Sequence, residues 1–148
     1  MSIDDFIIIH AKMSAMFQRR IQKLRKHLKK EKLDAVLISE VSNIEYLTGY
    51  SNFSKDEREA YILIGKDFGY IITDGRYSEA IKKQVPHFQL FERSPKRPAD
   101  KLFKNLQKKI KILGIEEDEL TVAEHKILSK HFKTTKHFDV GFLRSVKT

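Results

Sequence analysis

The sequence contains no cysteine and only six glycines among 148 residues. Without cysteine the chain can form neither disulfide bonds nor thiolate metal sites, which is compatible with a reducing compartment. The glycines are isolated from one another, so there is no glycine-rich phosphate loop, and no Gly-x-Ser-x-Gly motif marks a nucleophilic serine. Nucleotide-dependent catalysis and serine-nucleophile catalysis therefore have no support.

Long apolar runs are also missing near the amino terminus. The longest run there, Phe6 to Ile9, is too short for a signal-peptide core or a membrane-spanning helix, and Asp4 and Asp5 precede it. We therefore expect a cytoplasmic protein with no membrane partner.

Lysine and arginine outnumber the acidic residues, 29 to 20, and give a net charge of +9. Such a charge is compatible with binding to a nucleic acid, to an anionic membrane surface or to an acidic partner, and also with solubility alone. The charge therefore does not distinguish among these functions. The length of 148 residues suits one domain, which can bury about 68 to 70 % of its unfolded surface.

Apolar periodicity predicts helices that alternate with strands. A helix over about 11–32 places Met13, Phe17, Ile21, Leu24 and Leu28 on one stripe, whereas residues 1–10 show no clear period. The next elements are a strand over 33–38, a short helix over 43–47 capped by Ser42, antiparallel strands over 61–64 and 70–73, and a helix over 75–84 capped by Asp74. They are followed by strands over 87–91, 112–115 and 134–140, with helices over 99–110 and 121–132.

This order predicts an α/β fold, a three-layer α/β/α domain on a mixed sheet of five to six strands. The second long helix of the carboxyl-terminal half begins with Thr121 and Glu124, which have the spacing of a capping box. We expect that helix to bury Val122, Leu128 and Phe132.

Two short motifs stand where an apolar strand gives way to a helix or turn, the place where open α/β sheets put residues that face a ligand. Residues 43–50 read Asn-Ile-Glu-Tyr-Leu-Thr-Gly-Tyr, and residues 73–77 read Thr-Asp-Gly-Arg-Tyr. Their order and separation resemble the amino-terminal domain of the creatinase, prolidase and aminopeptidase P family. The motif residues are Asn43, Tyr46, Thr48, Gly49, Asp74, Arg76 and Tyr77.

The resemblance covers residues 17–147 and includes Leu33-Asp34-Ala35 and Gly114-Ile115-Glu116. It implies the same three-layer fold, with a ribonuclease H-like motif, over residues 16–141. Residues 1–15 would be an extension. Residues 142–148 would begin the linker to a carboxy-terminal metallopeptidase domain that lies outside this chain.

In the peptidase members that second domain holds two metal ions, usually Mn, Zn or Co, through two Asp, one His and two Glu. The ions activate a water that attacks the bond before proline. None of these ligands can be matched here, and the six histidines form no i, i+4 pair. We therefore expect no catalytic residue, no metal site and no cofactor in this chain.

The resemblance also implies partners. These are the chain's own catalytic domain, a second subunit in a homodimer, and proline-containing peptides as substrates of an Xaa-Pro dipeptidase or aminopeptidase P-like enzyme. The loop over 51–59 would reach the neighbouring subunit's substrate pocket. There Phe53, expected to be exposed, would cover an apolar side chain, and Arg58 would hold a carboxylate with two hydrogen bonds.

Other interpretations stay open. Asn43 and Asp74 also suit helix caps and Tyr46 a core position, and the loop over 51–59 also suits a solvated surface. The whole chain also suits a stand-alone interaction or regulatory module, or part of a creatinase-type amidinohydrolase. The basic face from Arg19 to Lys32 suits nucleic acid, although its only aromatic residue belongs to the buried stripe.

Overall fold

A six-stranded mixed sheet forms the centre of the protein, whose structure is a computed structural model that describes residues 1–145. The strand order is β4-β3-β2-β1-β5-β6. The β1–β2 and β2–β3 pairs are antiparallel and the other three are parallel, so the predicted hairpin is confirmed. The strands are β1 (Ala35–Ile38), β2 (Ala60–Gly65), β3 (Gly69–Asp74), β4 (Gln89–Arg93), β5 (Ile112–Ile115) and β6 (Thr134–His137).

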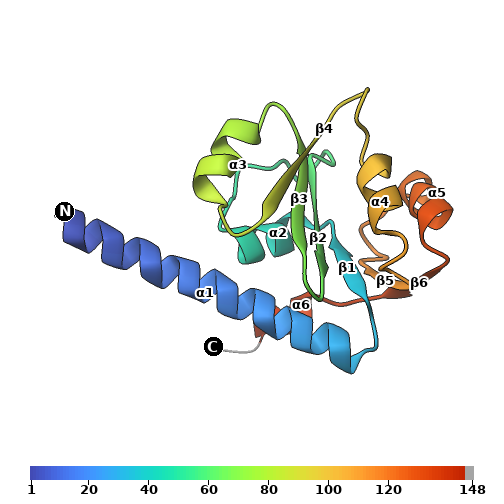
Figure 1. Ribbon diagram of the computed structural model, residues 1–148, viewed down its shortest axis with the longest axis horizontal. Coiled ribbons are helices and arrows are strands. Elements are labelled where there is room, and N and C mark those ends of the chain that lie inside the picture. Colours follow the sequence, from blue (N-terminus) through green and yellow to red (C-terminus); the bar gives the residue numbers. More distant parts are fainter. Residues whose placement is uncertain (146–148) are drawn as a thin grey trace.

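Helices cover both faces of this sheet (Figure 1). They are α1 (Ile3–Lys30), α2 (Val41–Thr48), α3 (Ser78–Gln84), α4 (Asp100–Leu106), α5 (Val122–His131) and α6 (Gly141–Ser145). Because strand side chains alternate between faces, Val36 and Ile38 join the core under α1, α2 and α3, whereas Ala35 and Leu37 join the core under α4 and α5. The predicted α/β/α layering is therefore confirmed.

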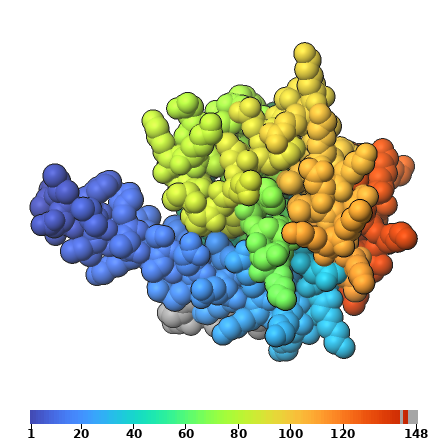
Figure 2. All heavy atoms as spheres, viewed as in Figure 1, coloured from blue at the N-terminus to red at the C-terminus, as the bar shows by residue number. Residues whose placement is uncertain are grey.

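The first helix begins earlier than its periodicity predicts. The Ser2 hydroxyl accepts a hydrogen bond from the Asp5 N–H and caps the helix. Its inner half buries Phe17, Leu24 and neighbouring apolar residues against the sheet, but Met13 is 47 % exposed, so the prediction that Met13 lies on the buried stripe is wrong. The outer half of α1 projects beyond the body of the protein (Figures 1 and 2).

Several predicted helix ends are corrected. Glu40 precedes α2 with no side-chain cap, so Ser42 does not cap it. Helix α3 begins at Ser78 rather than at Gly75, because the Asp74 carboxylate accepts the Arg76 N–H and holds a turn instead of capping the helix. The capping box at Thr121 is confirmed, but Val122 is 73 % exposed instead of buried.

The described carboxyl-terminal end of the chain is helical. Residues 141–145 form α6, and Leu143 is buried in the core beneath α1. The rest of the predicted linker, residues 146–148, lies outside the described residues. Among residues 1–145, no helix has both the length and the apolar character needed to cross a bilayer.

Gly49 is required where α2 ends and the chain turns. Its φ is +80°, and a Cβ added there would lie 2.6 Å from the Phe17 ring. A side chain would therefore meet both backbone strain and a clash with α1.

We predict that Gly49→Ala lowers the free energy of unfolding by about 2 kcal/mol or more, measured by urea denaturation. Gly75→Ala is the matched control, because a Cβ at Gly75 meets the Glu92 carboxylate only at an ordinary contact distance of 3.4 Å. Equal midpoints for the two variants would contradict this account of the turn.

Candidate functional site at the carboxyl edge of the sheet

The topology brings most of the predicted site residues to one edge of the sheet. β1, β3, β4 and β5 all run in the same direction, so their carboxyl ends share an edge, and antiparallel β2 begins there. The residues at or next to this edge include Ser39, Arg58, Glu59, Asp74, Arg76, Arg93, Glu116 and Glu124. Acids and arginines thus gather where ligands bind in open α/β sheets.

Arg58 ties together three segments at this edge. Its Nε donates to Glu124 Oε2 at 2.9 Å, and its other nitrogens donate to the backbone carbonyls of Ser39 and Glu119 at 2.7 and 2.6 Å. Burial opposes the charge on Glu124, but hydrogen bonds from Arg58, the Thr121 N–H and Tyr61 hold the pKa of Glu124 below its ordinary value. Arg58 therefore holds the loop against β1 and α5.

Glu59 organises the loop on the other face of the edge. Its carboxylate accepts hydrogen bonds from the Tyr77 hydroxyl and the Ser54 N–H, and Arg76 lies 3.5 Å away. The Tyr77 and Ser54 bonds hold the pKa of Glu59 below its ordinary value, while Glu59 raises the pKa of Tyr77 to about 12. Glu59 is therefore a structural anion.

Phe53 packs inside an aromatic cluster next to Glu59. It is 5 % exposed, and its ring lies 4.8 Å from Tyr50 and 4.9 Å from Tyr77 between centroids. The expectation of an exposed Phe53 is wrong, because these two motif tyrosines cover it. The loop thus turns its one aromatic side chain inward.

The first motif begins around a buried carboxylate. Glu116, at the end of β5, accepts hydrogen bonds from the Ser39 and Glu40 N–H groups at 2.6 and 3.0 Å and from Asn43 Nδ2 at 2.5 Å. Burial raises the pKa of Glu116, against the opposite effect of these donors. Asn43 therefore links α2 to β5 instead of capping α2.

The other motif residues also make contacts within the domain. Thr48 Oγ1 donates to the Ile44 carbonyl and accepts from the Tyr50 N–H, closing α2. The Tyr46 ring lies 4.1 Å from the Arg20 guanidinium of α1. Asp74 pairs with Arg76 through two 3.0 Å hydrogen bonds, and the Arg76 bond lowers the pKa of Asp74.

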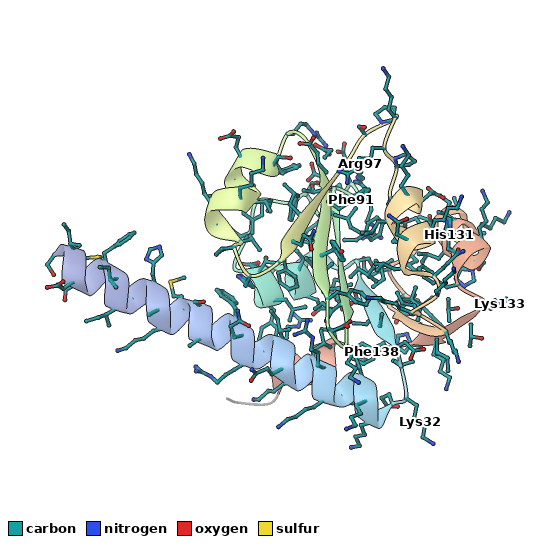
Figure 3. All side chains as sticks on the ribbon, viewed as in Figure 1. Lys32, Phe91, Arg97, His131, Lys133 and Phe138 are labelled. Atoms are coloured by element: carbon teal, nitrogen blue, oxygen red, sulfur yellow. The ribbon has the colours of Figure 1, made fainter. Side chains whose placement is uncertain are left out.

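A cleft of about 390 Å³ opens on the α4 and α5 side of this edge. Its apolar walls include Leu37, Phe103 and Ile127, and Arg93 and Glu124 contribute charged groups. Figure 3 shows His131 on this side of the sheet. His131, at the end of α5, links that helix to α4, because its Nε2 lies 3.0 Å from Oδ2 of Asp100 at the start of α4.

Sequence reasoning missed several residues that organise this edge. Tyr61 donates to Glu124, and Arg93 donates to the Arg58 carbonyl at 2.7 Å. Glu124 could have been found through its capping box. Nothing in the local sequence marks Tyr61 or Arg93, because their partners are brought near only by the fold.

Comparison with known proteins decides the family. A family model of the creatinase/prolidase N-terminal domain matches residues 20–144. The chain belongs to the creatinase/prolidase N-terminal domain family. No curated protein sequence matches it significantly.

Solved structures of the family share the fold. The aminopeptidase P of Streptococcus thermophilus has a TM-score of 0.72 and 25% identity, covering 86% of this chain and 98% of its own. The prolidase of Pyrococcus horikoshii OT3 has a TM-score of 0.72 and 25% identity over 88% of this chain, but only 36% of its own. An Xaa-Pro dipeptidase of Bacillus anthracis, 23% identical, shares the fold with a TM-score of 0.74 over 89% of this chain and 37% of its own.

This creatinase/prolidase-type domain is thus found within longer peptidases, and the family resemblance predicted from the two motifs is confirmed. The family match does not test the substrate contact predicted for Phe53 and Arg58, which stays a prediction.

We predict that Glu124→Ala lowers the free energy of unfolding by about 2 kcal/mol, because it removes the side-chain half of the capping box and the hydrogen-bond partner of Arg58 and Tyr61. Glu119→Ala is the matched control, since Glu119 lies 3.9 Å from Arg58 and is more exposed; its loss should cost less than about 0.5 kcal/mol. Chemical denaturation of both variants measures the difference. Equal losses would show that Glu124 does not organise the edge.

Acid should weaken the fold partly through Glu59. Because the pKa of Glu59 is lower in the folded protein than its ordinary 4.5, its stabilisation is complete above that value and is lost as pH falls through the folded pKa. We predict a shallower loss of stability between about pH 6 and about pH 3 in Glu59→Gln, measured by urea denaturation. Tyr77→Phe removes the main cause of the shift and should flatten the dependence in part. An unchanged slope in Glu59→Gln would contradict the assignment.

Proposed function

We propose that this chain is the amino-terminal, non-catalytic domain of a metal-dependent Xaa-Pro peptidase, and that it serves dimerisation and substrate selection. The observation that carries the proposal is the family match over residues 20–144. The likeness to a prolidase of which this chain spans 36% supports it further, because a much larger remainder is then available for catalysis.

The proposal assigns the metal ions to that remainder. A two-metal site needs several carboxylates that converge on ions about 3.5 to 4 Å apart. Within residues 1–145 no group of three or more His, Cys, Asp or Glu could hold a metal ion. The acids at the carboxyl edge are already bound to groups of the domain, as with Glu59, Glu116 and Glu124. They do not fit the metal centre.

Substrate selection is proposed for the loop over 51–59. Its two anchors, Phe53 and Arg58, are engaged within the domain, while Lys55, Asp56 and Glu57 are exposed. In this proposal the anchors hold the loop in the shape that meets the peptide, and Arg58 offers a guanidinium to the peptide carboxylate.

The test is a peptidase assay on the natural protein that contains this domain. It should release proline from Xaa-Pro dipeptides when Mn²⁺ or Co²⁺ is supplied, whereas residues 1–148 alone should not. If the metal-supplied protein cleaves creatine but no Xaa-Pro peptide, the amidinohydrolase interpretation replaces this one. If it cleaves neither and instead captures a separate protein, the domain is an interaction module.

We predict that Arg58→Ala in the full enzyme raises KM for a dipeptide at least severalfold and leaves the metal content unchanged. Arg25→Ala is the matched control. Arg25 also donates to two backbone carbonyls, those of Gly65 and Phe68, but at the opposite edge of the sheet. Both variants lose stability, and only Arg58→Ala should change KM. Identical kinetics in the two variants would remove Arg58 from the substrate site.

A further inference from the structure

The outer part of α1, residues 3–16, extends from the body and is here called the overhang (Figures 1 and 2). It precedes the family match, which begins at residue 20. Most of the exposed large apolar side chains described in the protein belong to it or to Met1 next to it: Met1, Ile3, Phe6, Ile7, Ile8, Ile9 and Met13.

The overhang lacks the tertiary packing that supports the inner half of α1. An isolated helix of this length is marginal, because most helical stability in proteins comes from packing of an apolar face. A contiguous exposed apolar surface in a soluble domain marks an interaction site. The overhang therefore has the character of an interaction surface.

The spacing of its apolar face is self-complementary. Ile3, Phe6, His10 and Met13 recur at intervals of three and four and lie on one side of the helix. These positions are symmetric about Ile8. Two overhangs that run in opposite directions therefore place Ile3 beside Met13 of the second copy. They also place Phe6 beside His10 of that copy.

Ring contacts favour the same arrangement. The Phe6 and His10 rings already lie 4.0 Å apart within one helix. Antiparallel pairing of two copies brings two such ring pairs together at the centre of the contact, where offset aromatic packing adds to the burial of apolar area.

The charges also favour opposite directions. The overhang begins with Asp4 and Asp5 and carries Lys12 near its base. In the antiparallel pair Asp4 of each copy lies level with Lys12 of the other along the helix axis, and the two macrodipoles oppose each other. In a parallel pair like charges would lie at the same level.

The geometry leaves room for such a pair. At Phe17 the same face meets the body, where the ring stacks on His87 at 5.1 Å and lies against Gly49. The overhang of 14 residues is about 21 Å long. Two antiparallel overhangs can therefore overlap with one body at each end.

We propose that the overhang pairs with the overhang of a second copy in an antiparallel two-fold contact, centred near Ile8. Such a contact is isologous and closes as a dimer. It does not rest on the proposed peptidase function, because residues 20–144 are not needed to form it.

Sedimentation of the 148-residue chain tests the pairing. The protein should be dimeric at micromolar concentration, and Phe6→Glu should weaken the dimer at least tenfold. Ile8→Glu is the matched control, because Phe6 and Ile8 are both 51% exposed but lie on different sides of the helix, so it should weaken the dimer far less. Glutamate is a good helix former, so neither variant removes the helix.

Cross-linking tests the direction, since the chain has no cysteine of its own. A mixture of Ile3→Cys and Met13→Cys chains should oxidise to a mixed disulfide dimer. Ile3→Cys alone should not cross-link, because antiparallel pairing separates its two copies by about 15 Å, beyond disulfide reach.

The proposal would be overturned by a monomeric wild-type chain, by equal effects of Phe6→Glu and Ile8→Glu, or by efficient cross-linking of Ile3→Cys with itself. If the chain is monomeric and binds anionic phospholipid vesicles, and if Phe6→Glu abolishes that binding, the overhang is assigned to a membrane surface instead. A dimer that survives Phe6→Glu would reject this contact, while dimerisation through the family domain would still stand.

Discussion

The carboxyl edge depends on the way Glu116 is held. A carboxylate removed from water costs several kcal/mol unless donors replace its hydration. Glu116, only 6 % exposed, receives two backbone N–H groups and the Asn43 amide. These donors lie at the start of α2, so the requirement to satisfy one carboxylate fixes the end of β5 against the end of β1. The parallel β1–β5 pair lies in the middle of the sheet, with β2, β3 and β4 on one side and β6 on the other.

The same requirement explains the contacts of Arg58. Its guanidinium has five donors, and here they reach Glu124 and two backbone carbonyls. The backbone carbonyls of Ser39 and Glu119 thus receive hydrogen bonds in place of those from water. The same contacts fix the loop over 51–59 at its carboxyl end. Glu59 and Tyr77 fix the loop from the opposite face. The loop is therefore held by two charged side chains, next to each other in sequence, that point in different directions.

Sequence patterns predicted the layers of the fold because apolar periodicity reports burial directly. They failed at helix ends and for Met13, where a periodic stripe continues past the body that covers it. They also failed for Phe53, because a polar loop gives no sign that Tyr50 and Tyr77 close over its aromatic ring. The motif residues were recognised, but their partners come from distant segments, as with Asn43 and Glu116, and periodicity carries no information on such pairs.

The basic charge of the chain follows its helices. Four helices begin with acids and end with bases, which matches the helix macrodipole. Their last turns carry His27, Lys29, Lys30, Lys82, Lys83, Lys104, Lys130 and His131. Because α1, α3, α4 and α5 each lead into the amino end of a parallel strand, these bases gather at the amino edge, opposite the acids and arginines. The helix macrodipoles therefore explain where these basic residues lie, and the net charge of +9 by itself does not identify a polyanionic partner.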